Sequence, residues 1–265
     1  MADNLIDART LHGDLAPTRV FDIRWKLNDP AHGLKAYLSG HIPGAVFVDL
    51  DDDLSAPEGP GRHPLPDPAT FAATLGRLGL TPDDDVVVYD DSAGTVAARM
   101  WWMLRSIGHD RVRLLDGGFD AWLDEDFPVE TEPFTPVATT YPVPDGFSGV
   151  VDIEDLDGRT LVDVRAPERY EGRTEPVDRI PGHIPGAINI PSSEALEAGS
   201  FRQRSELDRI YGALQSPVIS CGSGVVACHT ALAIAESGRP IPEVYIGSYS
   251  EWSSSGRPVA TGSKP

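Results

Sequence analysis

The feature that most restricts the fold of this chain is an internal repeat. The pentapeptide His-Ile-Pro-Gly-Ala occurs at 41–45 and again at 183–187. Other segments recur in the same order: 21–24 as 162–165, 87–89 as 218–220, and 117–122 as 247–252, where Gly117 and Trp122 match Gly247 and Trp252. Matches that keep one order at a nearly constant offset indicate a tandem duplication.

Each copy alternates short apolar segments with amphipathic ones. In the first copy we expect strands at 20–23, 45–48, 86–89 and 112–115, and helices at 68–78 and 95–107. Near-continuous apolar strands between helices are typical of a parallel sheet covered on both faces. The sequence therefore predicts an α/β fold with two domains, residues 1–130 and 146–265, each a parallel β-sheet with helices on both faces. The proline-rich segment 131–145 is predicted to be an extended linker.

Composition excludes several classes of function. The 265 residues include 22 Lys and Arg against 41 Asp and Glu, and a net charge of −19 argues against binding to nucleic acid or to an anionic membrane surface. No apolar stretch is long enough to span a membrane, and the start lacks the pattern of a signal peptide. Two cysteines make no disulfide framework and no metal-ligand spacing is present, so we expect a cytoplasmic protein without a metal site.

The second copy contains a cysteine in a short glycine-rich turn. The apolar run 218–220 ends at Cys221, which is followed by Gly222-Ser223-Gly224 and then by a helical apolar pattern. In such a strand–loop–helix unit, backbone amides curl round the sulfur near the positive end of a helix dipole, and both effects favour the thiolate. The two glycines let the backbone approach the sulfur closely.

The first copy lacks this nucleophile. Aligning the loops on Gly94 and Gly224 places Asp91 opposite Cys221. A carboxylate cannot replace a thiolate in sulfur chemistry, so the second copy is predicted to carry the reaction.

These residues together give the chain a resemblance to the tandem-domain rhodanese superfamily of sulfurtransferases. The resemblance rests on 221–225, both His-Ile-Pro-Gly-Ala segments, 163–165, 169–172 and 247–252. It implies an inactive N-terminal rhodanese-like domain, a catalytic C-terminal one and an active site in the cleft between them. It also implies sulfane transfer through a persulfide on Cys221, without a cofactor, to an acceptor such as cyanide, a small thiol or thioredoxin.

The resemblance further implies the donor and the site residues. Members that prefer thiosulfate have basic residues after the cysteine, whereas members that prefer 3-mercaptopyruvate have Gly and Ser, as here, so the small anionic donor is expected to be 3-mercaptopyruvate. The family motifs then assign a triad to Ser223, His41 and Asp29. They assign the substrate carboxylate to Arg169 and Arg179, and the substrate-binding loop to Gly222, Gly224, Val225 and Val226, the last of which stands where the family commonly has threonine.

Several alternatives stay open. His41 recurs as His183, so its role is structural or catalytic, and Ser223 is either catalytic or a helix cap. Cys228 is either a core residue or a redox partner of Cys221. A thiosulfate sulfurtransferase and a non-enzymatic sulfur-carrier module are the competing functions. A phosphatase with a cysteine loop is disfavoured because no arginine or lysine lies between Cys221 and His229.

Overall fold

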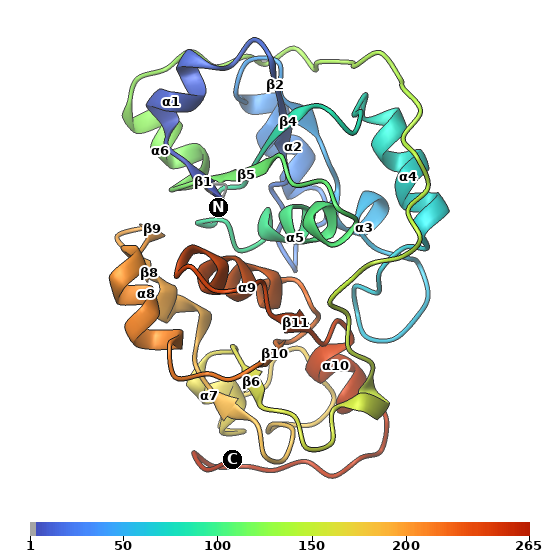
Figure 1. Ribbon diagram of the computed structural model, residues 1–265, viewed down its shortest axis with the longest axis vertical. Coiled ribbons are helices and arrows are strands. Elements are labelled where there is room, and N and C mark those ends of the chain that lie inside the picture. The colour runs from blue at the N-terminus through green and yellow to red at the C-terminus, as the bar shows by residue number, and fades with distance from the viewer. Residues whose placement is uncertain (1–3) are drawn as a thin grey trace. The chain divides into compact units, whose positions relative to one another are not determined.

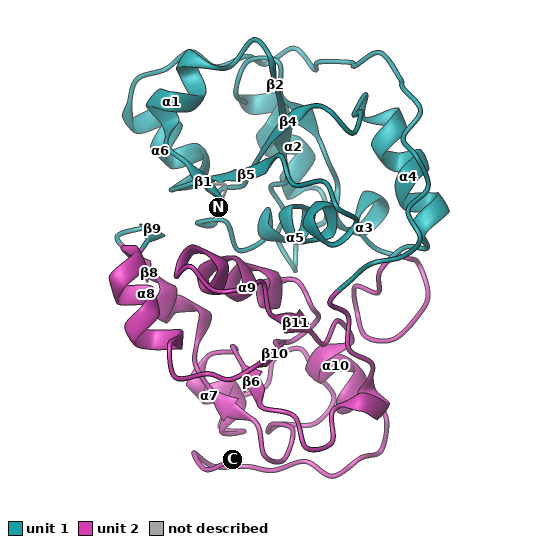
Figure 2. Cartoon of the chain, viewed as in Figure 1, with its two compact units in different colours: residues 1–55, 66–148, 198–201 teal, residues 56–65, 149–197, 202–265 magenta. Residues whose placement is uncertain are grey.

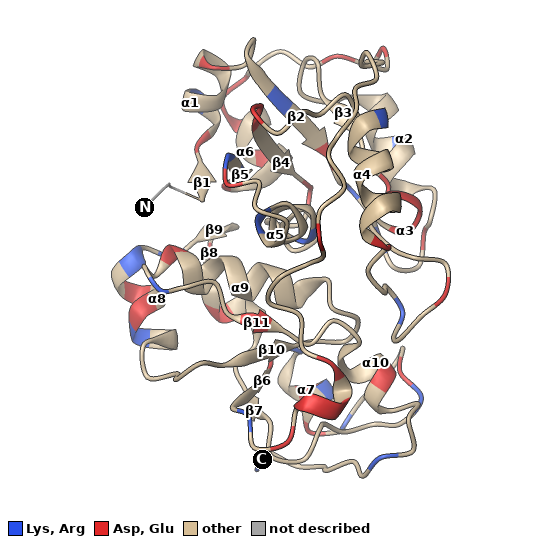
Figure 3. Cartoon of the chain, turned by 45° about the vertical axis from the view of Figure 1, so that its right-hand side comes forward, with Lys and Arg blue, Asp and Glu red and all other residues tan. Residues whose placement is uncertain are grey.

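The computed structural model describes residues 4–265, which form two compact units (Figures 1 and 2). Unit 1 comprises the described residues up to Ser55, together with Pro66–Ser148 and Ala198–Phe201. Unit 2 comprises Ala56–Leu65, Gly149–Glu197 and Arg202–Pro265. Acidic segments recur along the ribbon of both units, as the net charge requires (Figure 3).

Unit 1 is built on a five-stranded parallel sheet with the spatial order β1-β5-β4-β2-β3. Its central strand β4 carries Val86, Val87 and Val88, all fully buried, because both faces of a parallel sheet are covered. The strands are β1 (Leu5–Ile6), β2 (Thr18–Asp22), β3 (Val46–Phe47), β4 (Asp85–Tyr89) and β5 (Val112–Leu115), and the short β9 (Ser200–Phe201) also belongs to this unit.

The helices of unit 1 begin and end at recognisable signals. Helix α4 (Pro68–Arg77) starts where the Asp67 side chain accepts hydrogen bonds from the amides of Ala69 and Thr70, with proline in its first turn. The other helices are α1 (Ala8–Gly13), α2 (His32–Ser39), α3 (Leu50–Asp53), α5 (Ala98–Ser106) and α6 (Gly118–Asp124). The strands and helices predicted for the first copy are confirmed, with small shifts at their ends.

Unit 2 repeats the plan with a four-stranded parallel sheet in the order β11-β10-β6-β7. Helix α9 (Val226–Glu236) follows β10 and is apolar on nearly all sides, with eight of its residues buried, as expected of a helix within a core. The remaining elements are η1 (Ile153–Asp155), β6 (Leu161–Asp163), α7 (Pro167–Tyr170), β7 (Ile188–Asn189), η2 (Ser192–Ala195), β8 (Leu196–Glu197), α8 (Arg204–Tyr211), β10 (Val218–Ser220), β11 (Glu243–Val244) and α10 (Ser248–Trp252).

The repeat extends to side-chain contacts. Arg24 pairs with Asp22 and donates to the Gly40 carbonyl at 2.8 Å, and Arg165 pairs with Asp163 and donates to the Gly182 carbonyl at 2.7 Å. The indole nitrogens of Trp122 and Trp252 donate to the carbonyls of Pro128 and Pro258 at 2.9 and 2.8 Å. These paired residues have structural roles in both copies.

Two segments depart from the expected division of the chain. The proline-rich residues 131–145 contain no helix or strand but pack on unit 1, where the Thr139 amide donates to the Gly76 carbonyl at 2.8 Å. Residues 56–65, which lie within the first copy of the repeat, belong to unit 2. No helix among the described residues has the length and apolarity needed to cross a membrane.

Candidate active site

The loop after β10 holds the sulfur of Cys221. The Gly224 amide donates a hydrogen bond to Sγ over 3.1 Å, and the Ser248 hydroxyl lies 3.9 Å from the same atom. Gly224 has a φ of +76°, and a Cβ there would lie 2.3 Å from the Ile246 carbonyl oxygen, so only glycine fits this turn. Cys221 is 3% exposed, so the surrounding protein covers the residue almost completely.

The equivalent loop of unit 1 binds a carboxylate. Strand register pairs Asp22 with Tyr89 and the equivalent Asp163 with Ser220, so the next residues, Asp90 and Cys221, correspond. The Asp90 carboxylate accepts four backbone hydrogen bonds, each of 2.8 Å, from residues 92, 94, 96 and 97. Burial raises the pKa of Asp90, and these amide donors oppose that shift. The loop geometry thus gathers amides around one anionic side chain.

This register corrects the expected alignment. The loop from Asp90 to Gly94 is one residue longer than the loop from Cys221 to Gly224, so alignment on the glycines shifted the comparison to Asp91. Asp91 instead faces the His32 ring, with Oδ2 2.9 Å from Nε2. The conclusion that the first copy has no nucleophile at this position is unchanged.

Ser223, two residues after the cysteine, is joined to a histidine from the 56–65 segment. His63 Nδ1 lies 2.9 Å from Ser223 Oγ, and the two residues are 5% and 8% exposed. A buried hydroxyl–imidazole pair can move a proton between a reacting group and the ring.

His41 and Asp29, the other expected members of this triad, lie in unit 1. His41 is fully buried, stacks on the Tyr37 ring and has Nδ1 2.8 Å from the Tyr37 carbonyl oxygen. Its repeat counterpart His183 makes the same contacts with Tyr170. Asp29 is exposed in a turn. These contacts do not test a catalytic role for either residue, but the hydrogen-bond partner of Ser223 is His63.

The arginines of unit 2 form a cluster with buried carboxylates. Arg169, on α7, donates to Glu175 at 2.8 and 3.1 Å and to Asp178 Oδ2 at 2.8 Å. Arg165 lies 3.3 Å from the same Glu175. Burial would raise the pKa of Glu175, but the hydrogen bonds from Arg169 and from two backbone amides outweigh it and lower that pKa. The Arg169 side chain stays 23% exposed and can therefore also contact an anion.

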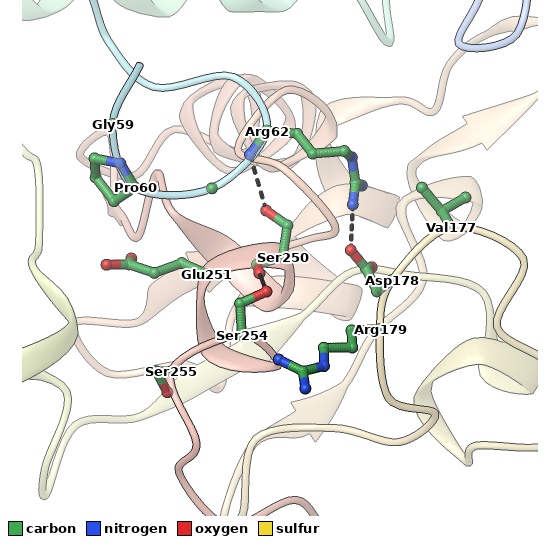
Figure 4. Close-up of a pocket in the computed structure, with 11 residues that line it drawn as sticks. Gly59, Pro60, Arg62, Val177, Asp178, Arg179, Ser250, Glu251, Ser254 and Ser255 are labelled. Atoms are coloured by element: carbon green, nitrogen blue, oxygen red, sulfur yellow. Dashed lines mark hydrogen bonds and ion pairs between the residues drawn. The ribbon is translucent and has the colours of Figure 1, made fainter.

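Arg62 adds a further guanidinium to this cluster. It forms an ion pair with Asp178, and its amide donates to Ser250 Oγ at 3.1 Å (Figure 4). Both Arg62 and Asp178 line a cavity of about 690 Å³, together with the exposed Arg179 and the polar side chains of α10. Cys221 does not line this cavity, but the lining residue Ser250 contacts the loop, because its amide donates to the Gly222 carbonyl at 2.9 Å.

The remaining predicted residues lie around the loop. A Cβ on Gly222 would be 3.0 Å from Arg62 Nη2 and 3.6 Å from both terminal nitrogens of Arg169. Val225 is buried at the N-terminal cap of α9, and Val226 opens that helix half-buried. Cys228 is fully buried with its thiol donating to the Gly224 carbonyl at 3.2 Å, and both cysteines are free.

His63 and Arg62 are not among the residues predicted from the sequence. Both lie in the Gly-Pro-Gly-Arg-His-Pro segment at 59–64. The repeat could have indicated them. His41 has a counterpart in the second copy, which favours a structural role, whereas the segment with Arg62 and His63 has no counterpart there, which favours a function specific to one site.

The known proteins that this chain resembles belong to one family, but they are assigned different sulfur donors. A Pseudomonas aeruginosa protein assigned as a 3-mercaptopyruvate sulfurtransferase is 41% identical, with 92% of each chain covered. A Mycobacterium tuberculosis protein assigned as a thiosulfate sulfurtransferase is 42% identical, with 97% of each chain covered. The solved 3-mercaptopyruvate sulfurtransferase of Leishmania major superposes with a TM-score of 0.88 at 31% identity, covering 97% of this chain and 75% of that one.

These relatives share one enzyme class, which confirms the sulfurtransferase predicted from the sequence. The rhodanese-like domain family matches residues 3–125 and 151–255, one match for each copy of the repeat. The chain has two α/β units, each with a parallel sheet, and a cysteine loop, and it belongs to the rhodanese-like domain family.

Proposed function

We propose that this chain transfers a sulfane sulfur from 3-mercaptopyruvate to a thiol or cyanide acceptor through a persulfide on Cys221. The observation that carries the proposal is the position of the sulfur. Cys221 Sγ accepts the Gly224 amide at the place where unit 1 binds the Asp90 carboxylate with four amides. A loop of this shape stabilises the thiolate before the reaction and the persulfide anion after it.

The first half-reaction balances with the residues present. The Cys221 thiolate attacks the sulfur of the substrate thiol, an S–S bond forms, and the C–S bond breaks to leave the enolate of pyruvate. The proton of the substrate thiol is the proton that the enolate carbon needs. The Ser223 hydroxyl and the His63 imidazole, 2.9 Å apart, can carry this proton from the substrate sulfur to the enolate carbon. In the second half-reaction an acceptor removes the outer sulfur and restores the thiolate.

The need for this proton favours 3-mercaptopyruvate over thiosulfate. With thiosulfate as donor the leaving group is sulfite, and no carbon atom needs a proton. That reaction therefore does not require proton transfer by a buried hydroxyl–imidazole pair. We therefore place His63 in the role that the sequence assigned to His41. Arg169, with its exposed face, and Arg179 are the proposed partners of the substrate carboxylate.

The proposed acceptors are cyanide, a small thiol or thioredoxin, and the proposed location is the cytoplasm. The two free cysteines support this location, since a reducing compartment keeps the Cys221 sulfur available for each turnover.

Mass spectrometry after incubation with donor tests the proposal. Wild-type protein should gain one sulfur atom, Cys221→Ser should gain none, and Cys228→Ser should gain one as the matched cysteine control. A sulfur gain in Cys221→Ser would contradict the persulfide assignment. Initial rates of thiocyanate formation with the two donors test the donor, and a ratio that strongly favours thiosulfate would contradict 3-mercaptopyruvate.

A further inference from the structure

We propose that Asp178 sets the charge selectivity of the donor site: it neutralises Arg62 and Arg169, so that the site beside Cys221 accepts a donor with one negative charge and disfavours a dianion. The inference rests on the sulfurtransferase function proposed above. It concerns the choice between donors and not the chemistry at sulfur.

The first support is the position of the two guanidinium groups. Gly222 directly follows the nucleophile, and the space of its absent side chain is bounded by Arg62 Nη2 at 3.0 Å and by Arg169 Nη1 at 3.6 Å. An anionic donor whose sulfur reaches Cys221 therefore has its charged group beside these two cations. Both side chains remain partly exposed, at 28% for Arg62 and 23% for Arg169.

The second support is the way Asp178 joins these cations. One carboxylate oxygen pairs with Arg62 and the other lies 2.8 Å from Arg169 Nη2. Its side chain is only 1% exposed, and its amide donates to Glu175 at 3.0 Å, which fixes the residue in the cluster. Such a carboxylate lowers the charge that both arginines present to a ligand, and solvent screens it little.

The charges of the whole cluster balance. Arg62, Arg165 and Arg169 face three carboxylates, those of Asp163, Glu175 and Asp178. The adjoining cavity adds one further arginine, Arg179, and one further carboxylate, Glu251, to its lining. A site without surplus positive charge can offer hydrogen bonds to one carboxylate, but it cannot compensate the second charge of thiosulfate.

The burial of Asp178 shows that its charge is costly to the fold. Burial raises the pKa of the Asp178 carboxyl above its ordinary value, although Arg62 and Arg169 act in the opposite direction. The ion pairs with Arg62 and Arg169 therefore hold a buried charge next to the donor site.

The test compares donors in Asp178→Asn, which keeps the shape of the side chain and removes its charge. We expect the ratio of kcat/KM for thiosulfate to kcat/KM for 3-mercaptopyruvate to rise about tenfold, equivalent to about 1.4 kcal/mol. Asp178→Glu keeps the charge and should return the ratio toward the wild-type value. Asp155→Asn, an exposed carboxylate of unit 2, makes the same change in net charge and should leave the ratio unchanged.

Arg62→Gln provides an independent test should Asp178→Asn fail to fold. This variant keeps the Asp178 carboxylate but removes one of its two arginine partners, so the donor site becomes more negative. The ratio of kcat/KM for thiosulfate to kcat/KM for 3-mercaptopyruvate should therefore fall, and the KM for 3-mercaptopyruvate should rise. A ratio that stays constant in the folded Asp178 or Arg62 variant, while Cys221 still gains sulfur, would overturn the selectivity proposal alone. Absence of sulfur on wild-type Cys221 with either donor would instead overturn the proposed function.

Discussion

Replacing His63 by glutamine separates the two donors most sharply. Glutamine can still hydrogen-bond Ser223 Oγ, which lies 2.9 Å from the ring, but it cannot take up and release a proton near neutral pH. The first half-reaction with 3-mercaptopyruvate requires a proton at the enolate carbon, whereas the departure of sulfite requires none. The variant should therefore lose activity with one donor only.

The expected loss of activity follows from the role of the Ser223–His63 pair in proton transfer, and the expected change in stability from its hydrogen bond. General acid–base catalysis by a positioned side chain contributes about 10² to 10⁴ in rate, so kcat with 3-mercaptopyruvate should fall by at least about 100-fold. The rate of Cys221 persulfide formation from thiosulfate should change by less than about threefold. Because glutamine can keep the hydrogen bond to Ser223, and even its loss would cost only about 1 kcal/mol in stability, the variant should remain folded at assay temperature.

The assay measures pyruvate and thiocyanate with cyanide as acceptor, together with single-turnover sulfur gain by mass spectrometry. His41→Gln is the matched control. Because His41 stacks on Tyr37 in the core of unit 1, its loss should lower the melting temperature and leave the donor ratio unchanged. Equal losses with both donors in His63→Gln, or a donor-specific loss in His41→Gln, would refute the proton-transfer argument.

Three further predictions concern the loops and the arginine cluster. Gly224→Ala should abolish sulfur transfer, since its Cβ would lie 2.3 Å from a carbonyl oxygen, whereas Gly186→Ala, with a φ of +86° and open space around it, should cost about 1 kcal/mol in denaturant unfolding and keep activity. Asp90→Ala leaves four amides, three of them in buried hydrogen bonds, without their acceptor and should destabilise the protein by at least about 2 kcal/mol; an unchanged unfolding midpoint would contradict this. Because the pKa of Glu175 is lowered in the folded state, its stabilisation is present above its ordinary value near 4.5 and is lost as the pH falls through the lowered value, so the stability difference between wild type and Glu175→Gln should shrink in acid.

Much of the fold was predictable because both copies carry local signals. Strand β4 and helix α4 have strong periodicity and clear boundaries, and the repeated Asp22–Arg24 pair marks the same buried contact as Asp163–Arg165. The prediction of Asp91 as the counterpart of Cys221 was wrong because one inserted residue lies between strand and helix, where an alignment on glycine cannot show the strand register.

The candidate site was predictable only in part. Cys221, Ser223 and Arg169 carry their signal in adjacent residues, since a cysteine in a glycine turn after an apolar strand has few uses other than chemistry. His63 and Arg62 carry none of that kind, because their neighbours are prolines and glycines that report only a loop.

The sequence by itself determined that the chain is a duplicated parallel α/β protein with a cysteine in one glycine-rich loop, because strand periodicity, turn glycines and repeated motifs are local properties. Only the tertiary structure decided which side chains surround that cysteine. Residues 56–65 leave the copy in which they are encoded and pack in unit 2, so His63 contacts Ser223 and Arg62 contacts Asp178 across 160 and 116 positions of sequence. Contacts at such separations depend on packing of the whole unit, and no local pattern of residues records them.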